Sequence, residues 1–235
     1  MFVFGNSQSK ARPLRRTPLF LAIAALLFGN AVHAAELAPA ERSALLDRLH
    51  ALRTAYPSME ADFTEEKTSH LLSRPLMTEG TVSFEVPDKF RREVKGNSPS
   101  LTVSDGKTLW IYYPAFKTAE LYTLGQRAFF DDSIAALTAG LNFQHIDEYY
   151  NFRAFSEPNG YRFELTPKRP SLRRVLQKLT VWMDADLKAQ KTEITLPKGD
   201  SVVTTYKNSR RIPLPASTFE FTPQPDVQVT RPLGK

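Results

Sequence analysis

The chain has 235 residues, a formal net charge of +6 at pH 7 and no cysteine. The missing cysteines exclude disulfide bonds, thiolate catalysis and cysteine-ligated metal sites, and leave no N-terminal cysteine for acylation. Residues 1–18 hold four of the 31 basic residues and no acid. The rest of the chain is therefore close to neutral, which removes the main electrostatic support for nucleic-acid binding.

Residues 1–34 have the order of a cleaved secretory signal peptide. Lys10, Arg12, Arg15 and Arg16 precede the apolar run LFLAIAALLF, and small residues before and at Ala34 suit cleavage after that residue. The apolar run is too short to span a bilayer, although a retained membrane anchor is the alternative interpretation. We therefore expect one exported domain, residues 35–235, that is soluble after cleavage.

The exported part opens with an amphipathic pattern that predicts a helix over about 39–56, ended by Pro57 and Ser58. Beyond it the apolar residues mostly alternate with polar ones, as in half-buried strands. Such strands are predicted at 59–64, 81–86, 90–94, 101–104, 109–113, 161–165, 179–183, 191–196 and 201–206. Short strands joined by tight turns indicate an antiparallel sheet.

The stretch SLTVSDGKTLWIYYPAFK, residues 100–117, departs from simple alternation. Asp105-Gly106 predicts a hairpin with a type I′ turn. On the second strand Leu109, Ile111 and Tyr113 form one apolar face, while Trp110 and Tyr112 place aromatic rings on the other. A core can cover one face only, so the second face needs another partner.

A second helix is predicted where Phe130, Ile134, Leu137 and Leu141 recur on one helical face. Asp131 to Ser133 supply N-cap candidates, and Gly140 lies near the C-terminal end. The last 23 residues contain five prolines, and we expect them to form an edge strand with a tail.

Catalytic chemistry has little support in the sequence. The histidines of the exported part, His50, His70 and His145, are isolated from one another. Ser104 and Lys107 match a Ser-x-x-Lys motif, but that motif requires a helix N-terminus and a Lys-Thr-Gly segment, and here a hairpin is predicted. We expect a protein that is not an enzyme and needs neither a metal nor a cofactor.

The two-faced strand favours binding of an apolar ligand. A curved antiparallel sheet can enclose an apolar space when helices close its open side. A plain hydrophobic core is the alternative, but the excess of large aromatic residues favours a ligand cavity. The candidate lining residues are Phe84, Trp110, Tyr112, Ile134, Leu137 and Phe163.

The chain resembles the periplasmic outer-membrane lipoprotein carrier (LolA-type) family over about residues 40–230. The segments that carry the resemblance are MEADFTEE, TEGTVSFEVPDKFRREV, LTVSDGKTLWIYYP, YRFELTPK and STFEFTPQPDVQV. The most specific are Val103 to Trp110 and the ending with Phe219, Phe221 and Pro223. The resemblance implies an α+β fold: an incomplete, strongly curved antiparallel β-barrel closed by a helical lid around an apolar cavity.

The same resemblance implies a function and its partners. A monomeric carrier in the periplasm binds the acyl chains of lipoproteins, receives them from an inner-membrane ABC transporter and delivers them to an outer-membrane receptor, without hydrolysing ATP. A LolA-like paralogue that carries another lipid, or senses envelope lipids without transferring them, is the alternative. An envelope hydrolase is the third hypothesis.

One position departs from the family pattern. Val86 precedes Pro87 where the family typically has an arginine, which is associated there with hydrogen bonds that hold the lid shut and with one-way transfer. Valine cannot donate such bonds. The candidates for the lid switch are therefore Val86, Arg91 and Arg92, the two arginines being possible substitutes.

Overall fold

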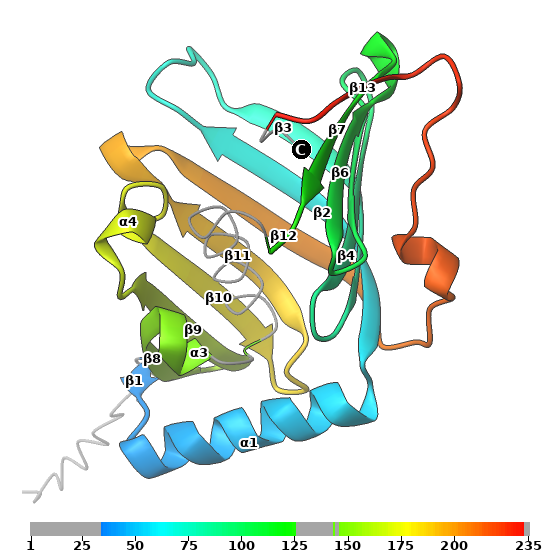
Figure 1. Ribbon diagram of the computed structural model, residues 1–235. Helices are drawn as coiled ribbons and strands as arrows, with labels where there is room; N and C mark the ends of the chain where they lie inside the picture. Colours follow the sequence, from blue (N-terminus) through cyan, green and yellow to red (C-terminus); the bar gives the residue numbers. More distant parts are fainter. Residues whose placement is uncertain (1–33, 126–142, 144–145, 233–235) are drawn as a thin grey trace, which may run out of the picture. The chain divides into compact units, whose positions relative to one another are not determined.

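A computed structural model of the chain describes residues 34–125, 143 and 146–232. These residues form a 13-stranded sheet with a few helices (Figure 1). The predicted signal peptide and the predicted helix with Ile134 and Leu137 lie outside the described residues. None of the helices in the described part has the length and apolar character that a membrane span requires.

Strands β2 to β7 form one run of neighbouring strands and β8 to β12 form a second, while β1 lies beside β8 and β13 beside β7. The first part of the chain holds β1 (Ala35–Glu36), α1 (Pro39–Ala55), β2 (Ser58–Thr68), β3 (Leu76–Glu85), β4 (Lys89–Lys95), β5 (Ser100–Ser104), β6 (Thr108–Tyr113), η1 (Pro114–Phe116) and β7 (Thr118–Thr123). The second part holds α3 (Ile146–Tyr149), β8 (Tyr150–Glu157), β9 (Gly160–Pro167), α4 (Pro170–Arg173), β10 (Lys178–Asp184), β11 (Ala189–Thr195), η2 (Pro197–Gly199), β12 (Ser201–Arg210), η3 (Ala216–Phe219) and β13 (Gln228–Thr230).

The sheet is open and almost wholly antiparallel. Its strand order is β1-β8-β9-β10-β11-β12-β2-β3-β4-β5-β6-β7-β13, so β1 and β13 are its two ends. Pairing of β12 with β2 joins the two runs, and only β13 pairs in parallel, with β7. The predicted antiparallel sheet and the edge strand near the C-terminus are confirmed, and the sheet does not close into a barrel.

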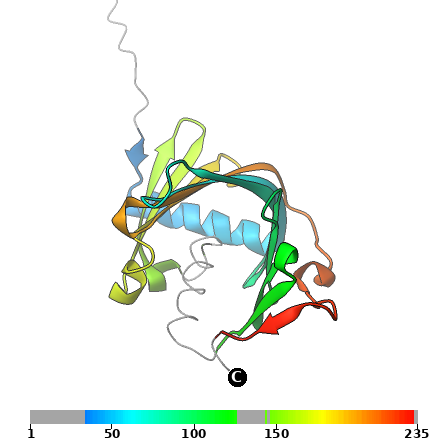
Figure 2. The same cartoon turned by 90° about the horizontal axis from the view of Figure 1, so that it is seen from above.

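Helix α1 begins and ends close to its predicted bounds. Pro39 occupies its first turn, where a missing N–H is harmless, and the Glu41 carboxylate accepts the N–H of Ala38 at 2.8 Å. Leu45 and Leu49 are buried in a core cluster with residues of β8, β9 and β10, including Phe163 and Leu179. Figure 2 shows α1 alongside the sheet. Burial of each leucine contributes about 1.5–3 kcal/mol.

The β5–β6 hairpin is confirmed, but the predicted turn type is wrong. Gly106 has a φ of +88°, whereas Asp105 is not among the residues with positive φ. A type I′ turn needs positive φ at both central residues. The Asp105 carboxylate instead fixes the loop, because it accepts the backbone N–H groups of Lys107 at 2.8 Å and Thr108 at 2.7 Å.

The C-terminal segment covers the aromatic second face of β6. Trp110 and Tyr112 pair across the ladder with Val103 and Leu101, so these four side chains share one face. The ring of Phe221 lies 5.5 Å from that of Trp110 and 5.1 Å from that of Tyr112. The partner of the second face is therefore a later segment of the same chain.

Candidate functional site

The opposite face of the sheet carries a pocket of about 330 Å³ that reaches both runs of strands. Its apolar lining comes mainly from β2, β3 and β4, and its far side from β10, β11 and β12. The lining residues are Arg53, Pro57, Met59, Ala61, Phe63, Glu65, Val82, Phe84, Glu85, Val86, Pro87, Asp88, Lys89, Phe90, Arg92, Thr102, Ser104, Leu109, Val181, Ala189, Thr192, Ile194, Thr204 and Tyr206. This size lies at the small end of ordinary ligand sites.

Strand register explains why these residues meet. Met59 pairs with Phe84 and Ala61 pairs with Val82, so alternation places all four on one face of β2 and β3. Phe84 in turn pairs with Phe90 of β4, and their stacked rings lie 6.1 Å apart. The result is a continuous apolar floor across three strands.

Most charges along the lining are neutralised in place. The Arg92 guanidinium donates to the Glu65 carboxylate at 2.9 Å and lies 4.5 Å from the centroid of the Phe63 ring. Lys89 pairs with Glu85 at 2.7 Å. These pairs let charged side chains border an apolar space without an uncompensated charge.

The phenol of Tyr206 is a polar group within this lining. Burial raises the pKa of Tyr206, and its hydroxyl lies 3.2 Å from that of Thr192. The phenol is therefore neutral across the physiological range and offers a hydrogen bond without a charge.

Arg53, in the last turn of α1, also borders the pocket. Its Nη1 donates to the thioether sulfur of Met59 at 2.9 Å. Burial, together with the nearby Arg211, lowers the pKa of Arg53 to about 10, so the side chain stays cationic at neutral pH.

The structure brings three of the sequence-predicted site residues together and separates others. Phe84, Val86 and Arg92 line the pocket. Trp110 and Tyr112 face the C-terminal segment instead, as described above, because alternation puts them opposite Leu109, which does line the pocket.

The other predicted residues that the structure describes lie outside the pocket lining. Phe163 is fully buried in the core cluster, where its ring lies 4.7 Å from that of Phe143. Arg91 is on the outer face with Trp110 and donates to the carbonyl oxygen of Thr218 at 3.4 Å. Ile134 and Leu137 lie outside the described residues.

Several lining residues were not singled out by the sequence, among them Arg53, Met59, Val82 and Tyr206. The alternation of β2 and β3 contains the signal for Met59 and Val82, because both share a face with Phe84. Arg53 carries no such signal, since a cation in the last turn of a helix is ordinary.

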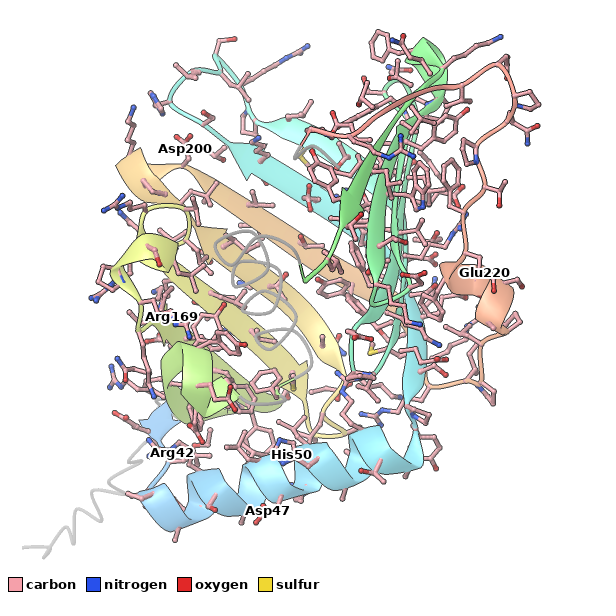
Figure 3. All side chains as sticks on the ribbon, in the orientation of Figure 1. Arg42, Asp47, His50, Arg169, Asp200 and Glu220 are labelled. Carbon is pink, nitrogen blue, oxygen red and sulfur yellow. The ribbon has the colours of Figure 1, made fainter. Side chains whose placement is uncertain are left out.

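Among the described residues, those considered for catalysis do not converge, and His145 lies outside the described residues. Ser104 ends β5, and its hydroxyl accepts the N–H of Gly106 at 3.1 Å within the hairpin, not at a helix N-terminus. His50 of α1 contacts the carbonyl oxygen of Phe143 at 3.0 Å, and His70 contacts Asp200 at the far end of the sheet (Figure 3 labels His50 and Asp200). Among the residues that the structure describes, no cluster of histidines and carboxylates could hold a metal ion.

Comparison with known proteins identifies the family. Residues 55–222 match the family model described as outer membrane lipoprotein carrier protein LolA. The chain belongs to the LolA family. Two relatives, each named outer-membrane lipoprotein carrier protein, come from Dechloromonas aromatica (strain RCB) and Proteus mirabilis (strain HI4320). The first is 28% identical over 181 residues, which is 76% of this chain and 83% of the relative. The second is 28% identical over 176 residues, 73% of this chain and 81% of the relative.

A solved structure supports the fold. The crystal structure of an uncharacterized conserved protein from Thermus thermophilus aligns with a TM-score of 0.50 and 15% sequence identity. The alignment covers 81% of this chain and 99% of that chain. At this identity the likeness concerns the fold alone.

Proposed function

We propose that the chain is a periplasmic carrier that binds the acyl chains of lipoproteins in the pocket and shuttles them from the inner to the outer membrane. The observation that carries the proposal is the apolar floor that Met59, Ala61, Val82 and Phe84 form in the pocket, on the face opposite the C-terminal segment. Membership in the LolA family supports the same interpretation.

Burial of an acyl chain against this floor supplies the binding free energy. Each methylene group removed from water contributes about 0.8 kcal/mol before the costs of association. A carrier needs no covalent chemistry for this step, in keeping with the dispersed positions of Ser104, His50 and His70. The proposal therefore includes no catalytic residue and no cofactor.

The compartment and the partners belong to the same proposal. The predicted signal peptide before Ala35 would direct the chain to the periplasm as a soluble monomer. There, an inner-membrane ABC transporter would supply the cargo and an outer-membrane receptor would accept it, as the family resemblance implies.

A second candidate function rests on Val86. This residue lines the pocket at the position where the resemblance leads us to expect the arginine of the lid switch. Of the other switch candidates, Arg92 lines the pocket but is paired with Glu65, and Arg91 lies on the opposite face. A LolA-like paralogue that carries or senses another envelope lipid would not need that arginine.

The test is binding of an apolar fluorescent probe to the purified full chain. Phe84→Glu places a carboxylate on the apolar floor and is expected to weaken probe binding more than tenfold, because a buried unpaired charge is costly. Phe116→Glu is the matched control, since Phe116 is 77% exposed on η1. Equal weakening by both variants, or by neither, with the circular dichroism spectrum unchanged, contradicts the pocket assignment.

Transfer separates the two candidate functions. A lipoprotein carrier should take up an acylated lipoprotein and release it to an acceptor membrane. If the protein binds the probe and a free lipid but does not take up or release an acylated lipoprotein, the result supports the paralogue that carries or senses another envelope lipid.

A further inference from the structure

The acids that line the pocket lie near Lys89 and Arg92, and Arg53 is the lining cation without an acid beside it among the described residues. Three cations and three acids line the pocket. Arg92 pairs with Glu65 and Lys89 pairs with Glu85. The third acid, Asp88, lies close enough to Lys89 to raise the pKa of that amine.

Arg53 has no acidic neighbour among the residues that the structure describes. Its one hydrogen bond runs from Nη1 to the sulfur of Met59, a weak acceptor. The neighbouring charge that affects it is a second cation, Arg211, whose guanidinium is held by the carbonyl oxygens of Asp186 and Leu187. The C-terminal end of α1 offsets only part of the cost of this charge.

The free donors of Arg53 are accessible. In the described part of the chain, the one side-chain polar atom that is sealed from solvent and lacks a partner is Thr78 Oγ1. The Nε–H and Nη2 groups of Arg53 are therefore not sealed from solvent, and Arg53 is one of the residues that line the pocket. A guanidinium presents these donors in a planar fork that matches a carboxylate or a phosphate.

We propose that the pocket takes an anionic amphiphile, with the apolar chain on the floor around Met59 and Phe84 and the carboxylate or phosphate on the guanidinium of Arg53. This rests on the proposed function for the apolar part and adds the charge of the ligand. Arg211 strengthens the attraction without needing to touch the anion, because a second positive charge nearby favours a negative group.

An anionic headgroup compensates the partly dehydrated charge of Arg53. A cation at the edge of an apolar space, without an acid beside it, loses part of its hydration. An anion that arrives with an apolar chain restores that interaction in a region of low dielectric, where an ion pair is stronger than in water. A neutral headgroup of the same length gains the apolar contact only.

The test uses ligands that share a twelve-carbon chain and carry either an anionic or a neutral headgroup. The purified full chain, loaded with the apolar fluorescent probe at about pH 8, is titrated with dodecanoate, dodecyl phosphate, dodecanol and methyl dodecanoate. We expect both anions to displace the probe at concentrations about tenfold lower than the two neutral compounds, the difference that one charge-assisted hydrogen bond produces. Acetate and inorganic phosphate should not displace it, which distinguishes a headgroup from a free anion.

Variants then assign the preference to Arg53. Arg53→Gln should bring the anionic and neutral compounds to within about twofold of one another, whereas Arg53→Lys should retain part of the preference. Arg48→Gln is the matched control, because Arg48 lies on the same helix with an exposed side chain that donates to the Tyr161 hydroxyl at 3.4 Å. This control should keep the full preference.

The outcomes separate this inference from the proposed function. If all four long-chain compounds displace the probe equally, or if Arg53→Gln leaves the preference for anions unchanged, the inference is overturned while the apolar pocket stands. If acetate or phosphate alone displaces the probe, the site binds a free anion and the inference is equally wrong. If neither probe nor amphiphile binds, the proposed function fails, and the inference fails with it.

Discussion

Removal of the Phe219 ring tests the assignment of the two faces of the sheet. Phe219 belongs to η3 in the C-terminal segment and is 2% exposed, and the carbonyl oxygen of its neighbour Thr218 accepts a hydrogen bond at 3.4 Å from Arg91 on the outer face of β4. A buried Phe→Ala change costs about 3 kcal/mol or more, since the removed ring leaves a cavity. In a domain of this size each kcal/mol shifts the melting temperature by about 2–4 °C, so Phe219→Ala should lower it by roughly 6–12 °C.

The assay is thermal unfolding followed by circular dichroism, combined with probe binding at room temperature. Because the segment covers the outer face, binding in the pocket should change by less than about twofold, although the fold is less stable. Phe116→Ala is the control, and its 77% exposure predicts a change within about 0.5 kcal/mol. A folded Phe219→Ala protein with unchanged stability, or with probe binding lost, would refute the assignment of the faces.

Three further predictions concern processing, the switch and a hairpin. N-terminal sequencing of the secreted protein should begin at or near Ala35, and an intact Met1 on a membrane-bound product would contradict the signal peptide. Val86→Arg should weaken cargo retention and speed release to acceptor vesicles, because it adds a donor at the pocket; unchanged retention and transfer rates would exclude Val86 from the switch. Hydrogen bonds from the His70 side chain, the His70 backbone and Ser69 lower the pKa of Asp200 to about 2. The stability that these bonds give the folded chain is therefore complete above about pH 4 and is lost as the pH falls through about 2. Asp200→Asn should therefore speed amide hydrogen exchange in Ser69 to Leu72, the connection between β2 and β3, at neutral pH. Unchanged exchange would show that these bonds do not hold this connection in place.

The strands with clear alternation could be predicted from the sequence, and some of the others could not. Helix α1 ends one residue before its predicted bound, and the strands around Phe84, Phe163 and Val181 lie where the pattern places them. Strand β8 was not predicted: in YNFRAFSE the alternation of Tyr150, Phe152 and Ala154 with polar residues is broken at once by the buried Phe155. The two residues of β1 are too few to carry any period.

The residues of the pocket were harder to predict from the sequence than the strands. The sequence indicates that β6 has two apolar faces but not which face borders the pocket, since either can be covered by chain far away in the sequence. Phe221, which contacts Trp110 and Tyr112, lies more than a hundred residues beyond them, and only the fold brings it there. The sequence also could not predict that Arg53 lacks an acidic partner among the described residues, because ion pairing depends on how distant segments pack in the folded structure.

Native mass spectrometry of the full chain, purified from its own cells, tests the proposed carrier function most directly. We predict that part of the protein carries a bound lipid or acylated lipoprotein, that the adduct contains an apolar chain, and that Phe84→Glu loses it while Phe116→Glu keeps it. A folded protein that carries no adduct and also fails to bind the apolar probe would contradict a carrier function for this pocket.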